Sequence, residues 1–243
     1  MKITQMAVPD AYRITPHRHE DRRGWFFEAF RAEELGEAIG YPFAVRQANY
    51  SGSRLHTLRG IHGTLLPPGQ AKLVTCVRGA VMDVVVDLRV GSPTFGCYDI
   101  TYQEEGSGLA VYLADGLGHA FLALTDDACM YYLCSEAYVP GTMIEVNPLD
   151  PEIAIPWGLN KTPIMSDKDA AAPSLREAAD AGILPTYEQC LAHYEALRRG
   201  PEPGGHDALR TGPDSGRSEA PRTGPEPGGH EALRKGPDSG GGQ

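Results

Sequence analysis

Side chains capable of acid–base chemistry lie within or beside apolar stretches of this sequence. His62, Lys72, His119 and Tyr132 all occur in or next to stretches rich in Val, Ile, Leu and Ala, and Asp169 lies in a charged turn. A polar group in an apolar strand is costly unless it is hydrogen-bonded or used. Together these residue types are the ones needed to remove a proton from carbon and to return one.

Each residue type has a plausible role in such chemistry. A histidine oriented by a carboxylate can act as a general base, because the carboxylate stabilises the imidazolium that forms. A lysine near a carbonyl oxygen stabilises the charge of an enolate, and a tyrosine on the opposite face can return the proton and so invert the stereocentre. The residue types alone leave a structural alternative open, in which His62 is a hydrogen-bonded core histidine, Lys72 lies on the surface and the tyrosines pack.

The elements that would position these side chains are mostly strands. β-Branched and apolar runs, separated by turn signals about every ten residues, predict strands over residues 58–64, 72–77, 80–87, 98–102, 108–113, 120–124 and 129–135. Such spacing favours an all-β sandwich or barrel over βαβ units. Helical patterns are confined to residues 32–39, 174–181 and 187–198. We therefore expect a jelly-roll-like β domain over residues 1–199. Strand alternation places Arg59 on one face of its strand and His62 on the other.

The last part of the sequence has a different composition. Residues 200–243 contain 12 glycines and 7 prolines, and they hold a duplicated 17-residue segment, GPEPGGHDALRTGPDSG at 200–216 and GPEPGGHEALRKGPDSG at 224–240. The segment also contains few apolar residues, and burying them cannot offset the entropy of ordering the chain. We predict a disordered tail, in which His206 and His230 are solvated.

Overall composition excludes several classes of function. The 243 residues carry a formal net charge of −10, which argues against a nucleic-acid partner. No apolar run reaches the 18 residues of a membrane span, and the N-terminus lacks the pattern of a secretory signal. The five cysteines are odd in number and form no CxxC pair, which favours neither a disulfide framework nor a zinc ribbon. We expect a cytoplasmic protein.

A series of short motifs, in one order along residues 5–190, resembles the dTDP-4-dehydrorhamnose 3,5-epimerase family. The motifs are DRRGWFFE (21–28), QAN (47–49), LRGIH (58–62), QAKLV (70–74), DVVVD (83–87), GSPTFG (91–96), HAF (119–121), YLCS (132–135), NPLDP (147–151) and SDKD (166–169). Each motif is weak alone, and their collinear order is specific. The resemblance implies a cupin-type jelly roll, with short helices at the C-terminal end of the domain, that acts on a dTDP-4-keto-6-deoxy sugar.

The resemblance also implies roles for individual residues. His62 matches the general base, Asp169 the carboxylate that orients it, Tyr132 the proton donor and Lys72 the group that steadies the enolate oxygen. Substrate-contacting positions correspond to Arg23, Phe26, Glu28, Gln47, Asn49, Arg59, His119, Tyr138 and Lys168. Among these, arginines suit a diphosphate. Phe26 and Tyr138 would border the nucleotide, with Tyr138 stacked on thymine.

The same resemblance implies no cofactor and no metal, because the keto group of the substrate supplies the acidity. His17 and His19 have the spacing of a metal pair but lie in a polar stretch, so we do not expect them to bind one. Family members are homodimers whose N-terminal segments cross between subunits, and we therefore expect a homodimer.

Three positions depart from the family pattern. Gly63-Thr64 replaces a typical Tyr-Gln, Met143-Ile144 replaces a Glu-His pair, and residues 155–157 read Ile-Pro-Trp where the family has Trp before Pro. We expect Gly63 to enlarge the pocket, and Glu145 to point to the opposite face, so that it does not replace the lost polar contact. Such changes resemble the branch that serves antibiotic deoxysugar pathways, where some members invert only C3 or only C5.

Four readings therefore remain. The first is epimerisation at C3, with or without C5. The second is C5-only epimerisation of a later deoxy or amino sugar. The other two are a non-catalytic nucleotide-sugar binding protein on the same scaffold and a metal-dependent cupin oxygenase.

Overall fold

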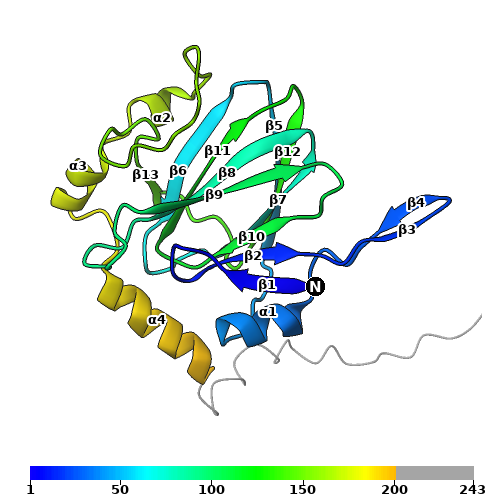
Figure 1. Cartoon of the computed structure of the whole chain (residues 1–243). Coiled ribbons are helices and arrows are strands. Elements are labelled where there is room, and N and C mark those ends of the chain that lie inside the picture. Colours follow the sequence, from blue (N-terminus) through cyan, green and yellow to red (C-terminus); the bar gives the residue numbers. More distant parts are fainter. Residues whose placement is uncertain (201–243) are drawn as a thin grey trace, which may run out of the picture. The chain divides into compact units, whose positions relative to one another are not determined.

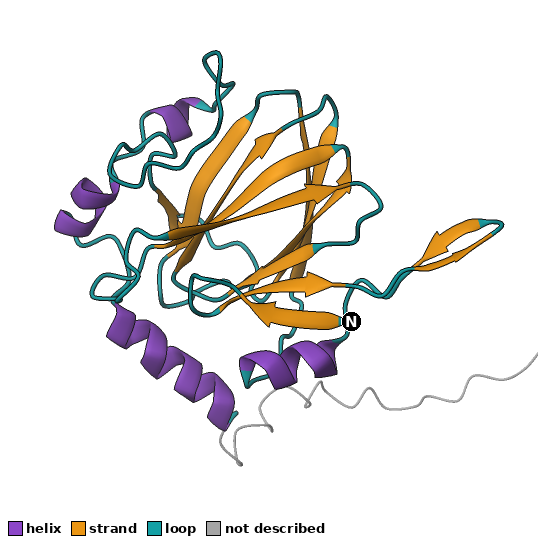
Figure 2. Cartoon of the chain, viewed as in Figure 1, coloured by secondary structure: helices purple, strands orange, loops and turns teal. Residues whose placement is uncertain are grey.

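The computed structural model describes residues 1–200 of the chain. Apart from Gly200, the predicted tail with its two repeats lies outside the described residues, and so do His206 and His230. Within the described residues, two antiparallel sheets face each other and helices lie at their outer surfaces (Figures 1 and 2). No helix of residues 1–200 is long and apolar enough to cross a membrane.

Eleven strands form the two sheets. The six-stranded sheet has the order β1 (Lys2–Gln5), β2 (Ala11–Thr15), β10 (Ala110–Leu113), β7 (Lys72–Arg78), β12 (Ala128–Cys134) and β5 (Gln47–Ser53). The five-stranded sheet has the order β13 (Met143–Glu145), β6 (Leu58–Thr64), β11 (Leu117–Ala123), β8 (Ala80–Asp87) and β9 (Tyr98–Glu104). Two further strands, β3 (His19–Asp21) and β4 (Gly24–Phe26), form a separate hairpin. The predicted cupin-type jelly roll is confirmed.

The apolar runs of the sequence become strands that are covered on both faces. Strand β8 is the clearest case, because every residue after Ala80 is buried. Val81 and Val85 belong to the core between the sheets, whereas Val84 and Val86 belong to a second core on the outer face of the five-stranded sheet. A strand buried on both faces reads as a continuous apolar run instead of an alternating one.

Four helices lie in the described residues, at α1 (Ala32–Ile39), α2 (Asp167–Ala170), α3 (Leu175–Asp180) and α4 (Tyr187–Arg199). Capping boxes begin α3 at Ser174 and α4 at Thr186, where each side chain and its Glu or Gln partner satisfy free N–H groups of the first turn. The three predicted helices are confirmed. The charged turn at 167–169 is a single helical turn, α2.

The strand predicted over residues 120–124 begins earlier in the structure. Strand β11 begins at Leu117, so His119 lies inside a strand instead of in the turn before it. The two glycines around Leu117 signalled a turn, but Gly118 is needed in the strand because a Cβ there would lie 2.5 Å from Ile61. Within β11, His119 pairs with His62 on β6.

Candidate active site

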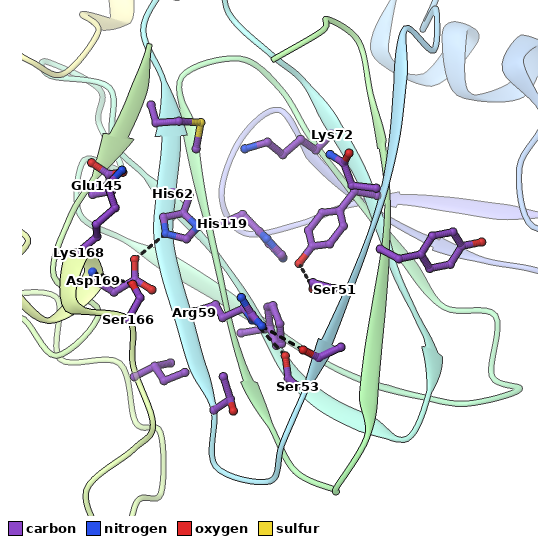
Figure 3. Close-up of a pocket in the computed structure, with 18 of the residues that line it drawn as sticks. Ser51, Ser53, Arg59, His62, Lys72, His119, Glu145, Ser166, Lys168 and Asp169 are labelled. Carbon is purple, nitrogen blue, oxygen red and sulfur yellow. Dashed lines mark hydrogen bonds and ion pairs between the residues drawn. The ribbon is translucent and has the colours of Figure 1, made fainter. Parts of the chain in front are cut away.

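A cavity of about 740 Å³ lies between the two sheets, a volume suited to a small organic ligand. All four predicted catalytic residues line it. Six of the nine predicted substrate-contacting residues also line it, namely Gln47, Asn49, Arg59, His119, Tyr138 and Lys168. Figure 3 shows His62 and Asp169 together on one side of this cavity and Lys72 across from them.

A histidine–carboxylate pair lies on the wall formed by β6 and α2. The Nε2 atom of His62 is 2.7 Å from Oδ1 of Asp169. Ser166 caps α2 by accepting a hydrogen bond from the Asp169 N–H, which fixes the carboxylate beside the imidazole. Burial alone would raise the pKa of Asp169, but the hydrogen bond and charge of His62 outweigh it and lower that pKa. Asp169 is therefore an anion that orients His62 for proton transfer.

The prediction that Arg59 and His62 face opposite sides of their strand is wrong. The register shifts between His119, which pairs with His62, and Phe121, which pairs with Arg59, so β6 carries one extra residue. Gly60 lies in this bulge with φ +115°, and a Cβ there would be 2.6 Å from the Cβ of Ala120. Bulges re-aim side chains next to active sites, and this one turns both Arg59 and His62 into the cavity.

Tyr132 faces the cavity from β12, in the six-stranded sheet. Its hydroxyl is 3.1 Å from Oγ of Ser51 on the neighbouring strand β5. Burial raises the pKa of Tyr132 to about 12, and the hydrogen bond with Ser51 lowers it in part. The phenol is therefore protonated at neutral pH and available as a donor.

Lys72, also in the six-stranded sheet, is buried with 7% of its surface exposed. It pairs across the sheet with Cys134, and burial lowers the pKa of Lys72 despite partial compensation by Cys134 and Asp115. Within residues 1–200 it forms no ion pair with a carboxylate. Lys72 therefore lines the cavity without a carboxylate partner among the described residues.

A second histidine–carboxylate pair lies beside the first. The Nε2 atom of His119 is 2.5 Å from Oδ2 of Asp83 on β8, and both side chains are buried. The His119 ring meets that of Tyr132 edge to face, with centroids 5.8 Å apart. Asp83 therefore holds the His119 ring in place, and Tyr132 packs against that ring.

Glu145 lines the cavity, contrary to the prediction that it points away. It pairs with His62 across β13 and β6, and Lys168 donates a hydrogen bond of 3.0 Å to its Oε1 atom. Strand alternation buries Ile144 in the outer core and turns Met143 into the cavity with Glu145. The carboxylate is therefore present in the pocket, two residues later than in the family pattern.

The hypothesis that Gly63 enlarges the pocket is wrong. A Cβ at this position would lie 3.2 Å from Cδ1 of Leu88 and 3.5 Å from Cβ of Ile144. Both belong to the core on the outer face of the five-stranded sheet. Because Gly63 follows His62 directly, strand alternation turns it away from the cavity.

Three predicted substrate residues are not in the cavity. Arg23, Phe26 and Glu28 lie on or just after the hairpin of β3 and β4, which projects from the sheets (Figure 1). The Arg23 side chain is 84% exposed and bonds to Asp21 in the same hairpin. Within residues 1–200, none of the three contributes to the cavity that holds His62.

The cavity also holds residues that the sequence pattern did not predict. Ser51 and Ser53 follow Asn49 at alternate positions of β5, and all three face the cavity. That two-residue spacing of polar side chains was the available signal. Behind the cavity wall, Asp83 was visible as a carboxylate inside a valine-rich strand, which implies a buried partner.

Comparison with known proteins places this chain in a family. The family model described as dTDP-4-dehydrorhamnose 3,5-epimerase matches residues 5–177. A dTDP-4-dehydrorhamnose 3-epimerase of Streptomyces niveus is 50% identical over 192 residues, which cover 79% of this chain and 92% of that protein. A dTDP-4-dehydrorhamnose 3,5-epimerase of Mycolicibacterium smegmatis is 49% identical over 199 residues, or 82% and 98% of the two chains.

Solved structures agree with these matches. ChmJ, a 3'-monoepimerase from Streptomyces bikiniensis in complex with dTDP-quinovose, has a TM-score of 0.78 at 47% identity, covering 80% of this chain and 98% of its own. The RmlC epimerase of Mycobacterium tuberculosis has a TM-score of 0.79 at 43% identity, covering 82% of this chain and all of its own. The chain therefore belongs to the dTDP-4-dehydrorhamnose 3,5-epimerase family, a family of sugar-nucleotide isomerases.

Proposed function

We propose that the protein epimerises a dTDP-4-keto-6-deoxyhexose at C3, with or without inversion at C5. The observation that carries this proposal is that the acid and the base come from different sheets. His62 belongs to the five-stranded sheet and Tyr132 to the six-stranded sheet, and both face one cavity. A sugar ring held between the sheets would have a proton acceptor on one face and a proton donor on the other.

The chemistry follows from this arrangement. His62, oriented by Asp169, removes the proton from the carbon next to the C4 ketone. The electrons move to the C4 oxygen, where the buried ammonium of Lys72 stabilises the enolate. Tyr132 then delivers its proton to the other face of the same carbon, which inverts the centre. The ketone of the substrate supplies the acidity, so the proposal needs no cofactor or metal.

The nucleotide end of the substrate would lie at the rim of the cavity. Arg59 donates hydrogen bonds to Oγ of Ser53 and the carbonyl of Gly52, which aim its guanidinium along the rim toward a diphosphate. Gln47 accepts a hydrogen bond of 2.7 Å from the N–H of Tyr138 and so positions that exposed ring to stack on the base.

We also propose a cytoplasmic homodimer in which each hairpin completes the cavity of the partner. The hairpin carries Arg23, Phe26 and Glu28, and the Phe26 residue is 66% exposed. Beside it, an apolar recess on the outer face of the six-stranded sheet is lined by residues that include Trp25, Tyr50 and Tyr131. Exposed apolar surface of this kind is typical of an interface. Five free cysteines fit a reducing compartment.

The direct test is incubation with dTDP-4-keto-6-deoxyglucose in deuterated water, followed by NMR of C3 and C5. Deuterium at C3 alone indicates a 3-epimerase, and deuterium at both carbons a 3,5-epimerase. The absence of deuterium at both carbons would contradict the proposal. The variant Tyr132→Phe, which keeps the ring and removes the donor, should exchange the proton without inverting the centre.

Glu145 favours a second candidate substrate. Its carboxylate lies on the same face as its cross-strand partner His62, and it neutralises Lys168. A carboxylate at this point suits a sugar that carries an ammonium or another strong hydrogen-bond donor. The variant Glu145→Gln should then lose more kcat/KM with an amino-sugar substrate, epimerised at C5, than with the unmodified sugar, epimerised at C3.

A further inference from the structure

Each inversion leaves the proposed catalytic pair in the wrong protonation state. After one turnover His62 holds the proton taken from carbon, and Tyr132 is a tyrosinate. We infer that Ser51 is the group through which Tyr132 regains its proton from solvent, so that Ser51 controls repeated turnover but not the first proton transfer. This inference rests on the proposed function.

The contact that carries the inference is the hydrogen bond of 3.1 Å between the hydroxyls of Ser51 and Tyr132, drawn as a dashed line in Figure 3. Among the described residues, Ser51 is the one side chain that forms a hydrogen bond with this phenol. His119 packs against the Tyr132 ring, but its Nε2 atom is engaged with Asp83. No second side-chain route to the phenolic oxygen is therefore visible within residues 1–200.

The position of Ser51 suits a connection to water. It lies on β5, the edge strand of the six-stranded sheet, and is partly exposed between the exposed residues Tyr50 and Gly52. A serine hydroxyl accepts one hydrogen bond while it donates another, so it can pass a proton along. Tyr132 itself lies deeper, where burial raises its pKa to about 12 and makes its anion strongly basic.

The protons balance over one cycle. His62 takes a proton from carbon, and Tyr132 gives its own proton to the opposite face of that carbon. The tyrosinate then takes the hydroxyl proton of Ser51, while Ser51 takes a proton from water. His62 releases its proton to solvent, so the enzyme returns to its starting state with no net change.

This step bears on whether one or two centres are inverted. A second inversion during the same binding event requires Tyr132 to be reprotonated while the sugar still occupies the cavity. Ser51 lines the same cavity as the sugar, so it can act in that event where water still reaches it at the edge strand. Loss of the hydroxyl should therefore reduce any double inversion more than the single one.

The experiment compares the first turnover with later ones. Wild type, Ser51→Ala and Ser51→Thr, each equilibrated in deuterated water, are mixed with less than one equivalent and then with excess dTDP-4-keto-6-deoxyglucose, and the products are quenched on a millisecond scale. We expect Ser51→Ala to form the first equivalent within about threefold of the wild-type rate and later ones at least about tenfold more slowly. Ser51→Thr keeps the hydroxyl and should restore repeated turnover.

Two further variants make the result specific. Ser53→Ala, on the same face of the same strand, removes the contact with Arg59 and should raise KM without separating first from later turnovers. Equal slowing of all turnovers in Ser51→Ala, or steady-state rates within twofold of wild type, would overturn the relay. If Tyr132→Phe still inverts its substrate, the proposed donor itself is wrong, and that result is distinct from failure of Ser51 alone.

Discussion

Two histidine–carboxylate pairs lie side by side, each with its histidine in the cavity wall, but their surroundings differ. The His62 side chain is 33% exposed, and its partner Asp169 comes from the short helix α2, outside the sheet. The His119 side chain is 6% exposed, and its partner Asp83 is fully buried in the neighbouring strand. Oδ1 of Asp83 has no hydrogen-bond partner in the described residues.

We expect this difference in exposure to give two identical pairs of chemical groups separate roles. A base must exchange protons with the substrate and with water, which the exposed pair can do. A buried pair cannot exchange easily, and its separation would leave an uncompensated polar group in the core. We therefore expect the His62 pair to govern rate and the His119 pair to govern stability and the placement of Tyr132.

The largest expected effect is on rate. Replacement His62→Asn should lower kcat about a thousandfold, because it removes the general base while keeping a polar side chain of similar size. His119→Asn should lower kcat by only about tenfold, since it disturbs the packing of Tyr132. Steady-state kinetics and solvent-deuterium exchange measure both. Equal losses in the two variants would remove the distinction between the pairs.

The next effect is on stability. Asp83→Ala should lower the free energy of unfolding by about 3 kcal/mol, because it leaves His119 buried without its partner. The matched change Asp169→Ala should cost less, since His62 can reach water when its partner is lost. Urea denaturation of both variants, followed by circular dichroism, provides the measurement. A larger loss for Asp169→Ala would contradict the comparison.

Asp169→Asn should lower kcat by about a hundredfold, because an amide does not stabilise the imidazolium. The variant should also alter the acid response. The folded-state pKa of Asp169 is lowered, so its contribution to stability is complete above its unfolded pKa of about 3.9 and is lost as pH falls through the folded value. Wild type should therefore lose stability below about pH 4 more steeply than Asp169→Asn. Parallel acid denaturation curves would contradict this assignment.

The smallest expected effect concerns Gly63, which points to the outer face of β6, away from the cavity. Gly63→Ala should lower the free energy of unfolding by about 1 kcal/mol, because the new Cβ crowds Leu88 in the outer core. The ratio of C3 to C5 products should stay unchanged, since the methyl group points away from the cavity. Product analysis by NMR checks this result, and a changed ratio would mean that the outer core influences the pocket.

Much of the fold could be predicted because local signals agree with it. Ser174 and Thr186 cap their helices as their sequences indicate, and the valines of β8 form a buried strand. The bulge at Gly60 could not be predicted, because one extra residue in a strand leaves the apolar pattern almost unchanged while it turns Arg59 over. Strand β13 was missed because its three residues are too few to give a period.

The candidate site was predictable where a residue type is unusual in its surroundings. His62, Lys72 and His119 interrupt apolar runs, and the family resemblance gave them roles. Ser51 was missed because a small polar residue on an edge strand reads as solvent-exposed surface. Arg23 and Glu28 were predicted to contact substrate, but among the described residues they lie on or just after the hairpin, outside the cavity. A sequence pattern gives the residue types of a site, and it does not say which chain of an assembly they serve.

We expect Lys72 to couple ligand binding in the cavity to the melting temperature of the protein. A buried amino group without a carboxylate partner is costly, and a ligand that brings oxygen atoms to it removes part of that cost. Binding to the folded state alone raises the melting temperature with ligand concentration. Selection for heat resistance without substrate would therefore favour Lys72→Met, which we expect to raise the melting temperature and to remove the proposed stabilisation of the enolate.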